Sequence, residues 1–403
     1  METKTTFKSE ISLFMLLFLT SSFTVTNDII SSAVTIGLWI LTAAYLFLSL
    51  RHIDTVMFLP FVLIVLAVIL SNIYNDEVIK NMISVIFSFV TVFFYANIYG
   101  YIVFKRSYIK LVKILCIVSL IGMVAFTIVP ALENIAVCNN ASGKVYSNFY
   151  IYTHPHMYDR NMGMFWEPGA FQTFIIVALL LEANEKKPNI KTIAIFIATI
   201  ITTFSTTGYI GLALALLQLL SKNNQINSRL RGFVIFASLS LIVVLFFFSD
   251  KIFETSESTV FGKVINFFNQ EEYNSSDAAT SASVRYFAVI KPLAEFFKSP
   301  ILGCGYSGLI ERTLEYTYGM NTCTFVNWFA VYGIVYGTAM LIGIVKFTKK
   351  INKSGIPFLL TLITLFVATM SENYVNNATI LLLALYGYKE YFIPEEEYEY
   401  ITN

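Results

Sequence analysis

Residues 55–74 read TVMFLPFVLIVLAVILSNIY, a run of twenty residues without a charged side chain. A helix of about 20 apolar residues crosses the roughly 30 Å of hydrocarbon in a bilayer. Comparable runs recur through the 403 residues, and the whole chain is 56% hydrophobic and 13% charged. Soluble chains carry about 25% charged residues. This composition excludes a soluble enzyme, a DNA-binding protein and a secreted disulfide scaffold, and it predicts a polytopic helical membrane protein.

Twelve apolar runs are predicted to cross the membrane. They cover residues 11–27, 29–50, 55–74, 82–104, 109–130, 169–184, 191–206, 208–221, 231–249, 323–346, 355–370 and 375–391. Lipid offers no partner to an unpaired backbone group, so each crossing must be a closed helix. A barrel strand would alternate apolar and polar residues, and these runs do not alternate. The predicted fold class is all-α, with about 12 transmembrane helices and two long external loops.

The loops differ in charge. If the N-terminus lies inside, the inner loops hold seventeen basic residues, whereas the four short outer connections hold only Lys80. The seventeen are Lys4, Lys8, Arg51, Lys105, Arg106, Lys110, Lys186, Lys187, Lys191, Lys222, Arg229, Arg231, Lys346, Lys349, Lys350, Lys353 and Lys389. Basic residues gather on the cytoplasmic side of membrane proteins. Both termini are therefore predicted to be cytoplasmic.

Two connections are long, and both fall on the outer side. They divide the chain into N-terminal helices at 1–130, a first external loop at 131–168, helices at 169–249, a second external loop with an interfacial helix at 250–322, and helices with a cytoplasmic tail at 323–403. Long loops in a compact fold are usually either functional or disordered. The candidate chemistry is therefore expected in these two loops.

The first external loop ends in a dense polar motif. Residues 152–169 read YTHPHMYDRNMGMFWEPG and contain His154, His156, Arg160 and Glu167. A His-x-His pair can bind metal, but no cysteine and only one nearby aspartate would complete the ligand set. Neither a metal site nor a cofactor is predicted.

Arg160 and Glu167 each allow two interpretations. An arginine among Met, Phe and Trp at a membrane surface normally has an anionic partner, although its side chain can also extend to water. Glu167 precedes Pro168, which is the pattern of a helix that begins at the proline with an acidic cap. The dipole of such a helix favours a charged carboxylate and should lower the Glu167 pKa.

The second external loop holds another basic motif. Arg285 begins a segment whose apolar residues keep helical spacing, so one face can lie on the membrane or on other helices. Pro292 should kink this helix or begin a new turn. The glycines of residues 303–308, GCGYSG, resemble a phosphate-cradling loop, but no Lys-Ser or Lys-Thr pair follows them. No nucleotide site is therefore predicted here.

These motifs, in this order and on this side of the membrane, resemble those of the bacterial O-antigen polymerase and O-antigen ligase family. The resemblance lies in Arg160-x-x-Gly-x-Phe-x-Glu-Pro-Gly169, in Arg285, and in Ser299-Pro-Ile-Leu-Gly-x-Gly305. It covers residues 150–340 by motif and the rest of the chain by hydropathy. Members of the family transfer glycans from a polyprenyl diphosphate outside the cytoplasmic membrane, without a metal, and hold the diphosphate with two arginines. The resemblance implies that Arg160 and Arg285 have this role.

The resemblance favours the polymerase branch of the family. Ligases place a His-Asn pair about eleven residues before a glycine segment, whereas counting back from Gly333 reaches Asn321, Thr322 and Cys323. The implied activity is polymerisation of lipid-linked oligosaccharide repeat units into a surface polysaccharide, either O-antigen or capsule. The expected partners are these lipid-linked oligosaccharides, the bilayer, a flippase and a chain-length regulator, with no nucleic acid.

The proton acceptor is not assigned by these motifs. The candidates are His156, His154 and Glu167, in that order, because histidine has an unperturbed pKa of about 6.5 and the helix dipole works against Glu167 as a base. Three alternatives to a polymerase stay open: a ligase that transfers glycan to a lipid or protein, a lipid-linked oligosaccharide flippase, and a non-catalytic assembly protein. The spans have almost no ionisable residue at their centres, which disfavours transport.

Overall fold

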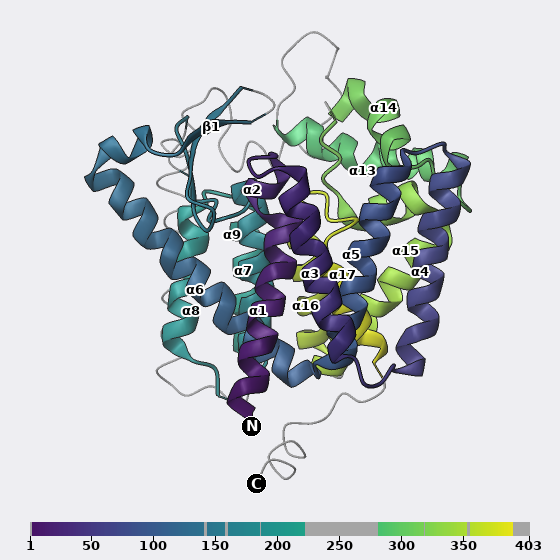
Figure 1. Ribbon diagram of the computed structural model, residues 1–403, viewed down its shortest axis with the longest axis horizontal. Coiled ribbons are helices and arrows are strands. Elements are labelled where there is room, and N and C mark those ends of the chain that lie inside the picture. Colours follow the sequence, from purple (N-terminus) through teal and green to yellow (C-terminus); the bar gives the residue numbers. More distant parts are fainter. Residues whose placement is uncertain are drawn as a thin grey trace.

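A computed structural model describes residues 2–140, 143–157, 160–185, 187–221, 281–317, 319–352 and 355–389 of the protein. The described part is mainly helical. Long helices stand side by side in a bundle, with a small β-sheet and two further helices at one end (Figure 1).

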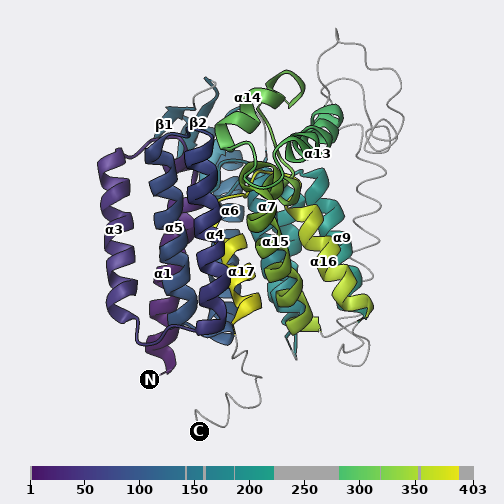
Figure 2. The same cartoon turned by 90° about the vertical axis from the view of Figure 1, so that its right-hand side faces the viewer.

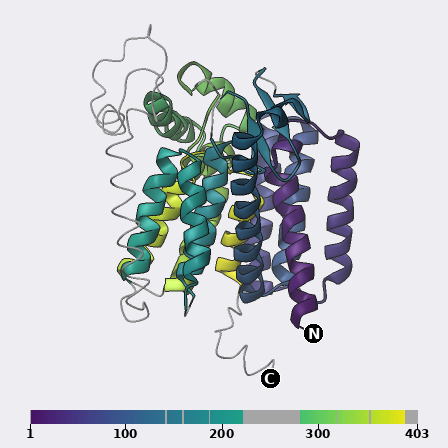
Figure 3. The same cartoon turned by 90° about the vertical axis from the view of Figure 1, so that its left-hand side faces the viewer.

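Successive helices from α1 to α9 that span the bundle run in opposite directions, as do those from α15 to α17 (Figure 1). Their bounds are α1 (Glu2–Ser21), α3 (Ser32–Ser49), α4 (Thr55–Tyr74), α5 (Ile79–Ile98), α6 (Tyr101–Ile128), α7 (Pro168–Ala183), α8 (Ile190–Thr202), α9 (Thr206–Ser221), α15 (Thr324–Asn352), α16 (Ile356–Ala368) and α17 (Ala378–Tyr388). Figure 2 shows the sheet, α13 and α14 together at one end of the bundle. The start of α1 lies at the opposite end (Figure 3).

Eleven of the twelve predicted spans overlap a helix, and the twelfth, 231–249, lies outside the described residues. Within the described residues, α3, α4, α5, α6 and α15 are long and apolar enough to cross a membrane. Helices α7, α8, α9, α16 and α17 are apolar but shorter than the roughly 20 residues of a full crossing. The chain is therefore a helical, membrane-embedded protein, and the number of its crossings stays a prediction.

The bounds of α4 follow from the residues at its two ends. The Asp54 carboxylate accepts hydrogen bonds from the N–H groups of Val56 at 3.0 Å and Met57 at 3.1 Å. These N–H groups have no partner within the helix, so the carboxylate caps its start. After Tyr74, the helix ends before Asp76, whose φ of 49° is left-handed. Helix α4 thus occupies the predicted span.

The first predicted span, 11–27, is wrong at its outer end. Helix α1 ends at Ser21, and α2 (Phe23–Thr26) is a separate turn. The Ser22 hydroxyl caps α2 by accepting the N–H of Val25 at 3.2 Å. At the break, the N–H of Phe23 donates to the carbonyl of Met164 at 2.8 Å. A segment of the first external loop is therefore bonded where the helix would have continued.

The first external loop contains a small sheet that the all-α prediction missed. After the 3-10 helix η1 (Pro130–Asn134), the strands β1 (Val137–Asn139), β2 (Val145–Asn148) and β3 (Thr153–Pro155) pair antiparallel in the order β1-β2-β3. Strands of three or four residues are too short to show a clear alternation of apolar and polar side chains. The sequence pattern therefore could not distinguish them from a loop.

The second external loop contains two helices, and its residues 250–280 lie outside the described part. Helix α13 (Ser281–Lys298) continues through Pro292 without ending, and α14 (Tyr306–Thr317) follows. The ring of Phe296 packs edge-on against that of Phe329 in α15, with centroids 5.6 Å apart. Aromatic packing of this kind seats α13 on the outer part of α15.

The glycine turn between α13 and α14 fits into a kink in α15. At Gly333, inside α15, φ is +78° and the backbone leaves the helical conformation. The N–H of Cys304 donates to the carbonyl of Ala330 at 2.8 Å. The next N–H, of Gly305, donates to the carbonyl of Val331 at 3.1 Å. These two N–H groups therefore bond to α15 and do not point into a phosphate site.

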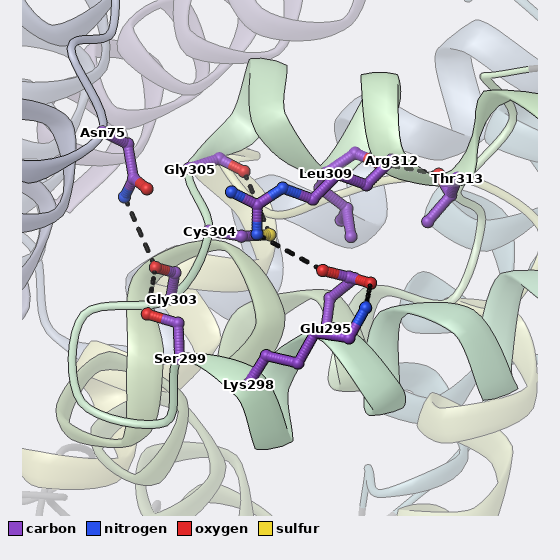
Figure 4. Close-up of polar contacts among 10 residues, drawn as sticks. All are labelled: Asn75, Glu295, Lys298, Ser299, Gly303, Cys304, Gly305, Leu309, Arg312 and Thr313. Atoms are coloured by element: carbon purple, nitrogen blue, oxygen red, sulfur yellow. Dashed lines mark hydrogen bonds and ion pairs between the residues drawn. The ribbon is translucent and has the colours of Figure 1, made fainter.

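Figure 4 shows how the same turn is held by its surroundings. The carbonyl of Gly303 accepts hydrogen bonds from the Ser299 hydroxyl at 2.8 Å and from the Asn75 amide at 3.4 Å. Beside the turn, Arg312 of α14 lies 3.3 Å from the carboxylate of Glu295 in α13. These contacts join the turn to α13, α14 and the end of α4.

Gly333→Ala is expected to destabilise the protein. A Cβ at this position would lie 2.0 Å from the carbonyl oxygen of Ile301, and φ of +78° is unfavourable for a residue with a side chain. We expect a loss of about 2 kcal/mol or more in the free energy of unfolding. The matched control is Gly37→Ala, because no atom lies within 4 Å of a Cβ there. A thermal midpoint in detergent that is lowered equally by both variants, or by neither, would contradict this account of the kink.

Candidate functional site

A polar cavity of about 860 Å³ lies at the end of the bundle that carries the sheet and α14. Five parts of the chain line it: the end of α1 with α2, the β1–β2 turn, the segment before α7, the segment from α14 to α15, and the α16–α17 turn. The lining includes Arg160, Trp166 and Glu167 of the first motif. The sequence motif and the cavity therefore coincide at these three residues.

The segment before α7 is a buried strap that fixes both ends of the motif. The side chains of Met162, Met164 and Phe165 are inaccessible to solvent. The N–H of Asn161 donates to the Thr202 carbonyl of α8 at 2.9 Å, and its amide donates to hydroxyls on α6 and α8. The strap is thus packed and bonded along its length, which holds Arg160 and Glu167 at its two ends in fixed positions.

Arg160 lines the cavity from the start of the strap. Its side chain is half-buried, and its Nε donates to the carbonyl of Thr203 at 3.1 Å. This bond fixes the plane of the guanidinium. A guanidinium has five N–H donors in a planar fork that matches the oxygens of a phosphate group. The geometry therefore suits an anion-binding role.

Glu167 lines the cavity from the end of the strap. The helix start predicted here is confirmed, because α7 begins at Pro168 with Glu167 at the N-cap position. The predicted acidic cap is wrong, since the Glu167 side chain makes no capping hydrogen bond. The predicted fall in its pKa is also wrong: burial raises the pKa of the Glu167 carboxyl, and the positive charges of Lys144 and Arg160 only partly oppose this.

Trp166 and Glu372 form a pair in the cavity wall that sequence reasoning missed. The indole Nε1 of Trp166 donates to Oε2 of Glu372, on the α16–α17 turn, at 3.1 Å. The only signal in the sequence is the polar trio Ser371-Glu-Asn373 between two apolar spans. In the sequence this trio is typical of a short connection between two spans. Nothing in the pattern predicts a contact with a motif about 200 residues earlier.

The two histidines of the motif lie on the sheet, and neither is among the residues that line the cavity. His154 is buried, its ring stacks on Phe126 with centroids 4.2 Å apart, and its Nε2 lies 3.5 Å from the Glu133 carboxylate. His156 Nε2 is 2.8 Å from the hydroxyl of Ser147. The His154 contacts join β3 to α6 and η1, and the His156 contact joins the residue after β3 to β2. These contacts indicate structural roles.

Arg285 lies in the first turns of α13, and its side chain is outside the described part of the chain. Its distance from Arg160 therefore stays untested. Within the described ranges, no three His, Cys, Asp or Glu residues are placed to hold a metal ion. Asn321 and Thr322 both line the cavity.

No protein-family model matches the chain, and no curated protein is significantly similar to it. The features of the protein that indicate a function are therefore its motifs and its cavity.

Proposed function

We propose that the protein is a membrane glycosyltransferase of the O-antigen polymerase kind. It joins oligosaccharide repeat units carried on polyprenyl diphosphate into a surface polysaccharide, O-antigen or capsule, on the external face of the cytoplasmic membrane. The observation that carries the proposal is that Arg160, Trp166 and Glu167 line one polar cavity at the end of an apolar bundle. A lipid-linked substrate has a polar head group and an apolar tail, so its binding protein needs a polar site beside an apolar surface.

The proposed reaction exchanges one bond for another at the anomeric carbon. The bond from this carbon to the diphosphate breaks, and a bond to a hydroxyl oxygen of the acceptor sugar forms. The diphosphate leaves with the bonding electrons, and Arg160 would stabilise its charge through bidentate hydrogen bonds. The hydroxyl proton passes to a base, for which we now place Glu167 ahead of His156 and His154. Glu167 faces the cavity and its pKa is raised, so it would accept a proton more readily than an ordinary carboxylate.

The rest of the lining suits uncharged sugar groups. Four asparagines, Asn27, Asn140, Asn321 and Asn373, line the cavity together with the indole of Trp166. Carboxamides both donate and accept hydrogen bonds, as sugar hydroxyls do. The Trp166 ring offers a flat apolar face, and its hydrogen bond to Glu372 fixes its position.

Two observations favour a polymerase over the alternatives. The ligase histidine is replaced by Asn321 and Thr322, which line the cavity without a titratable group. A flippase would need a polar path through the bundle, whereas the five longest apolar helices carry few charges. In this proposal the termini are cytoplasmic, the cavity is external, and a flippase and a chain-length regulator work beside the protein. Purified acceptors would separate the two enzymes, because a ligase extends a lipid or protein acceptor and a polymerase extends a second lipid-linked repeat unit.

Chelation is expected to leave turnover unchanged. In proteoliposomes with lipid-linked repeat units, polymer formation in excess EDTA should stay within about twofold of the untreated rate. The reason is that a fixed guanidinium can stabilise a leaving diphosphate as a metal ion would. Loss of turnover with EDTA, restored by a single divalent ion, would contradict the metal-independent mechanism.

A further inference from the structure

A second basic residue, Lys144, lies on the turn of the β1–β2 hairpin, directly before β2. Its N–H donates to Oδ1 of Asn140 at 2.9 Å, and its carbonyl accepts the N–H of Asn140 at 3.0 Å. Asn140 itself lines the cavity. The backbone N–H and the backbone carbonyl of Lys144 are therefore both bonded to a residue of the cavity wall.

The hairpin that carries Lys144 is anchored to α2, which also lines the cavity. Tyr146, two residues further along β2, packs its ring against Phe23 of α2 with centroids 4.5 Å apart. Phe23 lines the cavity, and both rings are almost fully buried. The position of the Lys144 backbone relative to α2 is therefore set by packed side chains.

The charges of Lys144 and Arg160 converge on one carboxylate. Both lie near enough to Glu167 to lower its pKa against the effect of burial, and Lys144 does so more strongly. Lys144 comes from the sheet and Arg160 from the strap, so two separate elements bring positive charge to the same place. Among the described residues, no carboxylate lies within 4 Å of the Lys144 ammonium, which is half-buried. Its charge is thus available to a ligand.

We propose that Lys144 and Arg160 together form the anion site of the cavity, and that this site binds the diphosphate of the lipid-linked substrate. Arg160 would supply the planar fork, and Lys144 would supply a compact charge that can follow the diphosphate as it leaves. The identity of the anion rests on the proposed function, whereas the existence of an anion site does not. Lys144 has no counterpart in the motifs that suggested Arg160 and Arg285.

Binding of inorganic pyrophosphate to the purified full-length protein tests the site without any glycosyl transfer. Titration calorimetry at constant ionic strength should show saturable binding. Lys144→Ala should weaken it about tenfold, the effect of losing one charge-assisted contact. Lys144→Arg should stay within about threefold of the wild type, since it keeps the charge. Lys80→Ala is the matched control, because Lys80 is an exposed base at the outer start of α5 and does not line the cavity.

The outcomes separate this inference from the proposed function. Lack of saturable pyrophosphate binding by the wild type, or equal affinity of the wild type and Lys144→Ala, would overturn the role of Lys144. If the thermal midpoint shows that Lys144→Ala is unfolded, Lys144→Gln takes its place with the same expected loss. Binding that needs Lys144 and Arg160, in a protein that polymerises nothing, would support the anion site and reject the polymerase.

Discussion

Arg160→Ala is expected to lower polymer synthesis at least about a hundredfold, with the protein still folded and inserted. The guanidinium lines the cavity, and its Nε bond to the Thr203 carbonyl fixes its plane. Removing one preorganised donor from a site where charge develops costs about 10²–10³ in kcat. Polymer is measured as the laddered products of lipid-linked repeat units in proteoliposomes.

Arg160→Lys is expected to rescue little, because an ammonium cannot form the bidentate pair with two phosphate oxygens. The family resemblance predicts the same loss for Arg285→Ala. Lys80→Ala should retain normal synthesis and serves as the control for loss of an external positive charge. Polymer of normal amount and length from Arg160→Ala, in protein with an unchanged thermal midpoint, would remove Arg160 from the site.

Glu167→Gln is expected to lower kcat about a hundredfold or more while pyrophosphate still binds. The glutamine keeps the shape of the side chain but cannot accept the proton of the acceptor hydroxyl, and general bases contribute about 10²–10⁴ to rates. Burial raises the Glu167 pKa above the usual carboxyl value of about 4.3. A base works only when deprotonated, so the wild-type rate should fall as the pH drops through this raised pKa. The residual rate of Glu167→Gln should not show this fall at low pH.

His156→Ala is the matched comparison for Glu167→Gln. Its ring contacts the Ser147 hydroxyl within the sheet and does not line the cavity, so its loss should change turnover by less than about fivefold. Near-normal turnover in Glu167→Gln with an inactive His156→Ala would restore the order of bases that the sequence alone favoured.

The sequence predicted the helical bundle because each apolar run is long and its ends are marked locally. Asp54 caps the start of α4, and the predicted and observed bounds of that helix agree. The same local signals predicted that α7 begins at Pro168. The outer end of the first span was predicted wrongly, because a contact between Phe23 and Met164, residues far apart in the sequence, interrupts it. The predicted spans 82–104 and 191–206 also run past the ends of α5 at Ile98 and α8 at Thr202.

The site was predictable only where one motif supplies it. Arg160 and Glu167 lie seven residues apart, so their joint presence could be read from the sequence. Glu372 lines the same cavity from the α16–α17 turn, and Lys144 is bonded to Asn140 of the cavity wall. No spacing in the sequence indicates either placement. The Glu167 pKa was misjudged for an energetic reason: a helix dipole is worth about 0.3–1 kcal/mol at a surface, whereas desolvation of a carboxylate can be several times larger.

The most direct test of the proposed function is the product formed by the purified protein alone. In proteoliposomes that contain one defined repeat unit on polyprenyl diphosphate, the wild type should produce a ladder of glycans spaced by one repeat unit. The same reaction should release polyprenyl diphosphate in equal amount to the glycosidic bonds formed. If the repeat unit is only moved across the bilayer, or if a ladder forms only after a polymerase from another source is added, the protein is not a polymerase.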